Sequence, residues 1–178
     1  GDCRYIWQQP AWPDWSYDPK RLMPLLAQVH QAQGLLRGRL HGLGMDQQDQ
    51  ANLRVLTEDV LKTSEIEGAS LNPESVRSSI ARRLGVDIGA LAPADRNAEG
   101  VVDMVLDATS NYQAPLTVQR LFAWHAGMFP TGQSVLSKIR AGDWRDDAHG
   151  PMQVVSGPMH RPKVHFEAPP AHLLDAEV

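Results

Sequence analysis

One periodicity constrains this chain more than any other feature. Between residues 20 and 128, apolar side chains recur at intervals of three and four, and glycine, proline and polar residues separate the runs. That spacing places the apolar residues on one face of an α-helix. We therefore expect five helices, over residues 20–40, 46–67, 72–84, 93–110 and 117–128.

The pattern changes after residue 150. Residues 152–155 and 163–166 are short runs rich in Val and Phe, separated by a loop that contains Gly157 and two prolines. Such runs are typical of strands joined by a loop, so we expect a β-hairpin over about 151–166. The predicted fold is mostly α, a helical bundle with one β-hairpin. We expect an N-terminal helical region over 1–110 and a second region over 111–178.

The first 19 residues combine aromatic and rigid side chains. Prolines at this density prevent a regular helix. We interpret the segment as an extended arm whose tryptophans pack onto the domain surface, with a peptide-binding groove as the alternative. The residues concerned are Trp7, Trp12, Trp15, Pro10, Pro13 and Pro19.

Charge and composition exclude several classes of protein. The formal net charge is −4 and no basic stripe is present, which argues against a nucleic-acid surface. No run approaches the roughly 20 apolar residues that span a bilayer. Cys3 is the single cysteine, so an internal disulfide is excluded, and no secretory signal pattern occurs. We expect a cytoplasmic protein. Its seven histidines lack metal-ligand spacing, so no metal site is predicted.

The last nine residues have the spacing of a beginning helix. Leu173, Leu174 and Val178 lie at helical intervals, and no glycine or capping residue precedes the end. We expect that the natural polypeptide continues beyond Val178. The alternative is a short, frayed terminal helix.

The predicted helix over 46–67 breaks a local rule at its end. Asp46 is its expected N-cap, and Gly68 is its expected left-handed C-terminal residue. The apolar stripe Leu53, Leu56, Val60 continues at the same spacing into Thr63 and Glu67.

A carboxylate at this position is disfavoured in two ways. Glu67 extends a stripe that faces the core or a partner, and an unpaired buried carboxylate is costly. It also lies at the negative end of the helix dipole, which costs about 0.3–1 kcal/mol. We infer that Glu67 meets a cation. The alternative, equally compatible with the periodicity, is that the stripe ends early and Glu67 is exposed. Glu65 points elsewhere and suits ordinary surface.

Residues 63–68, Thr-Ser-Glu-Ile-Glu-Gly, resemble the inhibitory motif of Fic-family proteins: Ser or Thr, three residues, Glu, then Gly or Asn. The arm around Tyr5-Ile6-Trp7 resembles the region that precedes the Fic core in one bacterial subgroup. Residues 139–145, 152–158 and 164–170 resemble the start of that core and its hairpin flap. The resemblance spans nearly the whole chain.

The resemblance implies a function that this chain does not carry alone. Fic proteins transfer AMP from ATP, with Mg²⁺, to a hydroxyl of a target protein. Their catalytic signature is His-Pro-Phe, one residue, Asp or Glu, then Gly-Asn-Gly-Arg, two residues, Arg. No Gly-Asn-Gly-Arg occurs here, so no catalytic residue is assigned. We expect no ATP or Mg²⁺ on this chain alone, and both in a full-length protein.

The family roles fall on two groups of residues. The resemblance implies that Glu67 pairs with the second arginine of the missing signature and that Thr63 or Ser64 fixes the helix end before Gly68. It implies that the hairpin binds a target protein by strand addition. The flap residues are Val154, Val155, Val164, His165 and Phe166.

These features leave two functions open. The first is the N-terminal regulatory part of a protein adenylyltransferase. Its expected partners are the remaining C-terminal Fic core and a target protein, and a homo-oligomer is a further option. The second is a non-catalytic helical inhibitor, similar to an antitoxin, supplied to a separate Fic protein. A reading frame that continues into the Fic signature distinguishes the first from the second.

Overall fold

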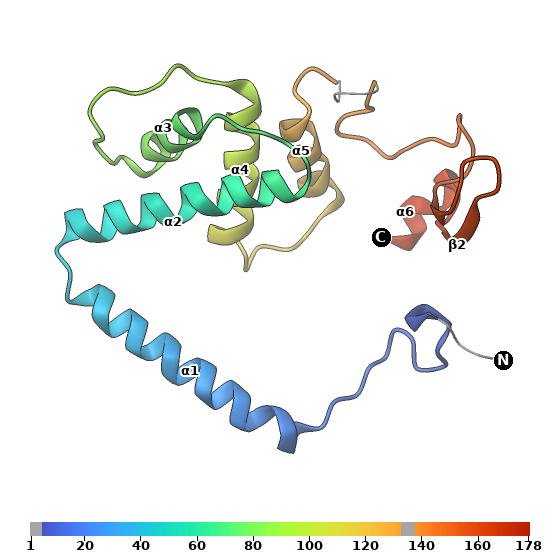
Figure 1. Ribbon diagram of the computed structural model, residues 1–178, viewed down its shortest axis with the longest axis horizontal. Helices are drawn as coiled ribbons and strands as arrows, with labels where there is room; N and C mark the ends of the chain where they lie inside the picture. Colours follow the sequence, from blue (N-terminus) through green and yellow to red (C-terminus); the bar gives the residue numbers. More distant parts are fainter. Residues whose placement is uncertain (1–4, 133–137) are drawn as a thin grey trace. The chain divides into compact units, whose positions relative to one another are not determined.

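The computed structural model describes residues 5–132 and 138–178 (Figure 1). Cys3 lies outside the described residues. The chain forms two compact units, residues 1–50 and 51–178, and each is described by itself. The domain boundary that the sequence places after residue 110 stays a prediction.

The elements follow the predicted order closely. The prediction of a mostly α-helical fold with one β-hairpin is confirmed. The α-helices are α1 (Pro19–His41), α2 (Met45–Ile66), α3 (Pro73–Leu84), α4 (Arg96–Ser110), α5 (Val118–Met128) and α6 (Leu174–Glu177); the strands are β1 (Gln153–Ser156) and β2 (Lys163–Glu167); short 3₁₀ helices cover Ile6–Gln8 and Ala171–Leu173.

Polar side chains at the helix starts explain where most helices begin. The side chains of Asp18, Asn72, Asp95 and Thr117 accept backbone N–H bonds in the first turns of α1, α3, α4 and α5. For α2 the predicted N-cap is wrong by two residues, since the helix begins at Met45 and Asp46 lies in its first turn. Gly44 O accepts the Gln48 N–H at 3.0 Å, so the backbone of Gly44 provides the start.

The core of the second unit lies between α2, α3 and α4. The ribbon of α2 crosses that of α4 in Figure 1, and apolar residues of all three helices form one buried cluster. Each fully buried Leu, Ile or Val side chain stabilises the fold by about 1.5–3 kcal/mol. The cluster consists of Leu53, Val60, Val76, Ile80, Ala81, Ala98 and Val102.

Ion pairs connect α3 to α4 beside this cluster. Arg82 and Arg83 both contact the Glu99 carboxylate at 2.7 Å, and Arg83 Nε also contacts Asp103 at 2.6 Å. The Arg83 pKa is raised, mainly by its hydrogen bond to Asp103. These half-buried charges fix the rotation of α3 against α4.

Two glycines let α4 and α5 approach each other closely. A Cβ built on Gly100 would lie 1.8 Å from Gly127 O, whereas a Cβ on Gly127 would lie 3.4 Å from Gly100 O. A side chain at position 100 therefore cannot fit without moving a helix, because the obstructing atoms are backbone.

The same pair of helices is joined by a polar network around Asp107. Its Oδ2 accepts hydrogen bonds from Arg120 Nε at 2.7 Å and Trp124 Nε1 at 2.8 Å. Arg120 also donates to the carbonyls of Asp107, Asn111 and Ala114, so one guanidinium satisfies the C-terminal end of α4. The Arg120 bond, with bonds from Asn111 and Trp124, lowers the pKa of Asp107 to about 2.

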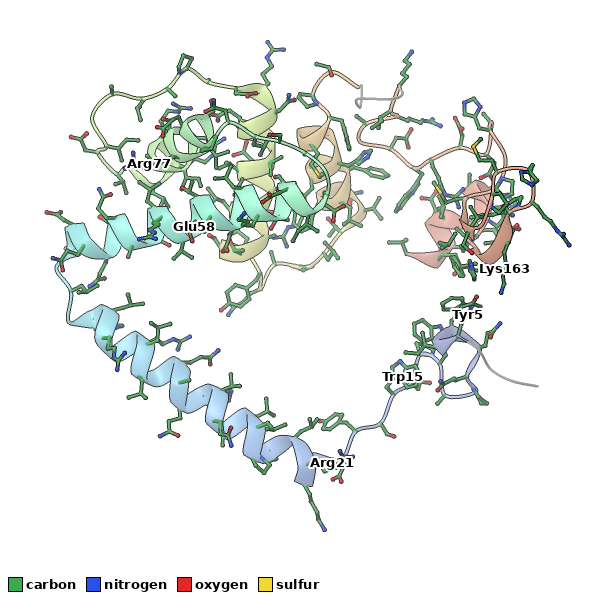
Figure 2. All side chains as sticks on the ribbon, in the orientation of Figure 1. Tyr5, Trp15, Arg21, Glu58, Arg77 and Lys163 are labelled. Carbon is green, nitrogen blue, oxygen red and sulfur yellow. The ribbon has the colours of Figure 1, made fainter. Side chains whose placement is uncertain are left out.

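The aromatic arm is organised by its own rings. Tyr5 stacks on Trp7 with ring centroids 4.5 Å apart, and Trp12 meets Trp15 edge to face at 5.9 Å. Figure 2 labels Tyr5 and Trp15 of this segment. The packing of the arm onto a domain surface stays a prediction.

The helix crossing gives a first test. We expect Gly100→Ala to lower the free energy of unfolding by about 1–3 kcal/mol, because the added methyl forces α4 and α5 apart. Gly127→Ala is the matched control, since its methyl meets only ordinary contact distances, and we expect a change within about 0.5 kcal/mol. Urea denaturation measures both, and equal effects would contradict the crossing.

The Asp107 network predicts a pH dependence. Folding holds this carboxylate charged, since its pKa is about 2 against an ordinary 3.8. Its stabilisation is complete above pH ~4 and is lost as the pH falls towards 2. Asp107→Asn should flatten the fall in melting temperature over this range. Asp59→Asn replaces an exposed carboxylate of α2 and should give the same pH dependence of the melting temperature as the wild type. If Asp107→Asn also keeps the wild-type pH dependence, the role of Asp107 is refuted.

Candidate functional site

The residue pattern at the end of α2 forms a fixed helix terminus. Gly68 adopts φ +77°, and its N–H donates to Glu65 O at 3.0 Å. The Ala69 N–H donates to Ser64 O at 2.8 Å. These two bonds and the left-handed glycine define a Schellman motif, so the predicted position of Gly68 as the left-handed residue that ends the helix is confirmed. Glu67 is the last residue before the reversal, and its backbone position is therefore set.

The buried face of α2 differs from the predicted stripe at its end. Leu53 and Val60 are 1% exposed, and the face continues into Ser64, which is 6% exposed. Thr63 and Glu67 are exposed. The turn of the helix thus places the Ser64 hydroxyl inward, against the unit's own core, and the Glu67 carboxylate outward. Of the two arrangements that the periodicity allowed, the structure has the exposed one.

The two glutamates of the motif have different surroundings. Glu65 contacts Lys62 Nζ at 2.7 Å, and this hydrogen bond lowers the pKa of Glu65 and raises that of Lys62. Both side chains are largely exposed, so the pair contributes little to stability. Glu67 has no ion pair or side-chain hydrogen bond with any residue in ranges 5–132 and 138–178. Its carboxylate is available to a cation from elsewhere.

A shallow hollow lies beside this helix end, where the chain turns from α2 into α3. Its volume is about 400 Å³. One wall carries the charged pair Lys62 and Glu65, and the rest is small or apolar. The lining residues are Leu61, Lys62, Glu65, Gly68, Ala69, Ser70, Leu71 and Pro73.

The hairpin presents apolar side chains to solvent. β1 and β2 pair antiparallel, and a bulge interrupts the ladder, since Val154 lies opposite Phe166 and Val155 opposite Val164. A two-stranded sheet leaves an outer edge on each strand, which is a template for a further strand. The exposed residues are Val154, Val155, Val164 and Phe166.

The bulge explains the placement of the fifth predicted flap residue. His165 is the extra residue of β2 in this register, and a bulge re-aims its side chain. Its Nε2 lies 2.5 Å from Ser156 Oγ, across the end of the hairpin. The structure thus gathers all five predicted flap residues on one hairpin. Cooperation between that hairpin and residues 63–68 stays a prediction.

Sequence reasoning missed the polar contacts that hold the base of the hairpin. Asp147 Oδ2 accepts the Ala171 N–H at 2.7 Å, and Trp144 Nε1 donates to Asp175 Oδ1 at 2.6 Å. Arg145 donates to the Pro169 carbonyl and to Asp147. These contacts join the segments before and after the hairpin. No local pattern predicts these contacts, because the partner segment lies 24 or more residues away.

Aromatic contacts extend this connection to α5. Trp144 meets Phe122 edge to face with centroids 5.0 Å apart. The Gly142 N–H donates to His125 Nδ1 at 3.1 Å, and His125 also packs on Phe129. The His125 ring is therefore held between the Gly142 backbone and the Phe129 ring. α5 and the hairpin base share one set of contacts.

Neither a metal-binding cluster nor a membrane-spanning helix is found among the described residues. In ranges 5–132 and 138–178, no group of three His, Cys, Asp or Glu residues is placed to hold an ion. Within the same ranges, no helix has the length and apolar character to cross a bilayer.

Comparison with known proteins gives one match. Residues 5–86 match a domain of unknown function, DUF4172. The matched segment contains the aromatic arm, α1, α2 and α3, and it includes the motif around Glu67. No curated protein matches the chain.

The hairpin base gives a third test. Asp147→Ala removes the acceptor of the Ala171 N–H and a partner of Arg145, and each lost bond costs about 1 kcal/mol. We expect faster hydrogen exchange of the amides in 153–167, with the protection of α3 and α4 unchanged. Asp146→Ala is the control, because its carboxylate makes no contact with residues 169–175. Equal exchange in both variants would argue against a role of Asp147 in holding the base of the hairpin.

Proposed function

We propose that this chain is the N-terminal regulatory part of a Fic-type protein adenylyltransferase and that Glu67 is its inhibitory residue. The enzyme transfers AMP from ATP to a hydroxyl of a target protein in the cytoplasm. The catalytic signature is supplied by a C-terminal core that follows this chain, so the chain alone is inactive.

One observation carries the proposal. Glu67 combines a fixed backbone position with an exposed carboxylate that meets no cation among the described residues. Two acidic side chains of the same helix have a local partner: Glu58 pairs with Arg54 and Glu65 with Lys62. An unpaired carboxylate at the negative end of a helix dipole is unfavourable by itself. A guanidinium from the catalytic core would relieve that cost.

The inhibition follows from competition for that guanidinium. The second arginine of the family signature holds the γ-phosphate of ATP, and Mg²⁺ neutralises the phosphates. When Glu67 holds the arginine, ATP lacks one of its anchors and is not positioned for transfer. Charge-assisted, bidentate pairs are among the strongest hydrogen bonds in proteins, so one carboxylate is sufficient for this role.

The rest of the motif supports the position of Glu67. Ser64 is buried on the side of α2 that faces the core, and Gly68 ends the helix. Thr63 is exposed one turn before Glu67, which places its hydroxyl next to the same surface. We assign Thr63 to contact with the catalytic core and Ser64 to the internal packing of α2.

The hairpin fits the role of the target-binding flap. Its exposed Val154, Val155, Val164 and Phe166 present apolar side chains beside an open strand edge. Strand addition uses such an edge for affinity and the alternating side chains for specificity. The contacts of Trp144, Arg145 and Asp147 with the segment after the hairpin hold the hairpin in place before a target binds. Target binding therefore need not order it.

The full-length protein gives the direct test. Glu67→Gly should raise labelling of the protein by ATP and Mg²⁺ roughly 10- to 100-fold, the factor that loss of a charged hydrogen bond supplies. Labelling is measured with α-³²P-ATP.

Glu65→Gly is the matched control. It places the same residue two positions earlier, in the same exposed helix end, and removes a carboxylate that already has a partner. We expect labelling at the wild-type level. Equal labelling of the Glu67→Gly variant and the wild type would refute the inhibitory role. If the reading frame lacks the Fic signature, the chain is instead the separate, antitoxin-like inhibitor.

A further inference from the structure

The closed end of the hairpin is a turn that carries two cations. Gly157 adopts φ +93°, and a Cβ built there would lie 3.4 Å from Arg161 O. The Arg161 N–H donates to Pro158 O at 2.9 Å. The backbone of the turn is thus defined by its own contacts. It places Arg161 just before β2 and Lys163 at the first position of that strand. Lys163 is labelled in Figure 2.

Neither cation has a carboxylate partner in the part of the chain that the structure describes. Arg145, the arginine that precedes the hairpin, contacts Asp147 at 2.6 Å. Arg161 and Lys163 are exposed and form no such ion pair with a described residue. Residues 148–166 contain no Asp or Glu, although the whole chain has 21. The closed end is therefore a positive patch without local neutralisation, on a chain whose net charge is −4.

The two faces of the hairpin differ in chemistry. Ser156 lies opposite Lys163 in the register, and its Oγ lies 2.5 Å from His165 Nε2, so these three polar side chains share one face. Val155 lies opposite Val164 at the neighbouring position, and both therefore lie on the other face. A strand added at an edge continues both faces, because its own side chains alternate between them. The hairpin thus fits an extended segment in which apolar and polar residues alternate.

The two cations determine which polar residues suit that segment. Opposite charges on neighbouring strands attract, and like charges repel, each pair by roughly 0.2–1 kcal/mol. Asp or Glu on the polar face of an added strand would therefore be favoured beside Lys163 and Arg161, and Lys or Arg would be disfavoured. A nucleic acid fits less well. Two cations neutralise few phosphates, and a nucleotide chain lacks the alternating amide and carbonyl groups that pair with a strand edge.

We propose that the hairpin selects target proteins that carry an acidic extended segment, with Asp or Glu alternating with apolar residues. The acidic residues lie on the face of Ser156 and Lys163, next to the closed end of the hairpin. This inference rests on the proposed role of the hairpin as the target-binding flap, and it adds the class of target. The strand edge supplies sequence-independent affinity, and Arg161 and Lys163 supply the selection.

The test measures binding of two labelled peptides to the full 178-residue chain. Both peptides have Val at every second position, and the positions between carry Glu in one peptide and Lys in the other. Fluorescence anisotropy at ~50 mM salt should show at least tenfold tighter binding of the Glu peptide, since attractive pairs replace repulsive ones. Raising the salt to ~500 mM should remove most of that preference, because exposed charges are screened.

Charge reversal at the closed end is the decisive variant. Arg161→Glu with Lys163→Glu should invert the preference, so that the Lys peptide binds more tightly. Arg37→Glu with Arg39→Glu is the matched control; it changes the net charge by the same amount on α1 and should leave the preference unchanged. The milder Arg161→Gln with Lys163→Gln guards against loss of the hairpin fold, and it should bring the two affinities together.

Backbone pairing is tested with modified peptides. Two versions of the Glu peptide carry N-methyl groups on alternate backbone amides, one version at the Val positions and the other at the Glu positions. An added strand turns every second N–H towards the edge, so one version should lose at least tenfold in affinity and the other should bind like the unmodified peptide. Unchanged binding of both versions would exclude strand addition and overturn the proposal.

Three further results would overturn it. These are equal affinity for the Glu and Lys peptides, binding of neither peptide, and an unchanged preference in the variant reversed at Arg161 and Lys163. Tighter binding of a short deoxythymidylate oligomer than of the Glu peptide would assign the cations to a nucleic acid instead. None of these measurements uses ATP or the catalytic core, so their failure is distinct from a failure of the Glu67 labelling test.

Discussion

The termination of α2 is the constraint on which the candidate site depends. Burial of Leu53 and Val60 against α3 and α4 fixes how far α2 is rotated about its axis. The left-handed Gly68 and its two Schellman bonds fix where the helix stops. Rotation and length together determine the direction of every side chain in the last turn. Ser64 is thereby directed into the core and Glu67 out of it. The carboxylate owes its placement to apolar packing on the opposite side of its own helix.

The ion pairs of the second unit show which of its cations already have a carboxylate partner. In the described part of the second unit, Arg82, Arg83 and Arg120 bind carboxylates between helices, and they stabilise the bundle. Lys62 binds Glu65 locally on the surface. Lys62, the cation nearest to Glu67 in the sequence, thus has a partner already, and Glu67 forms no ion pair within the described residues. A helix dipole disfavours a negative charge there, so the position is suited to contact rather than to stability.

Sequence reasoning recovered the elements and the helix end, because both rest on local rules. Spacing predicted α1 to α5, and Gly68 marked a helix end that depends on neighbours in the chain. The sequence left the exposure of Glu67 open, since a change of one position, from Thr63 to Ser64, decides which residue closes the buried stripe. It did not predict the bulge at His165 or the clamp of Asp147 on Ala171. Those contacts join residues distant in sequence, and no local pattern encodes them.

We propose above all that Glu67 holds an arginine of a catalytic core. An experimental structure of the full-length protein, in which this chain precedes that core, measures the claim directly. We predict that the Glu67 carboxylate lies about 2.7–2.9 Å from guanidinium nitrogens of the second arginine of the Fic signature, the spacing of a charge-assisted hydrogen bond. A Glu67 side chain that remains in solvent, with that arginine free or bound to another carboxylate, would contradict the account.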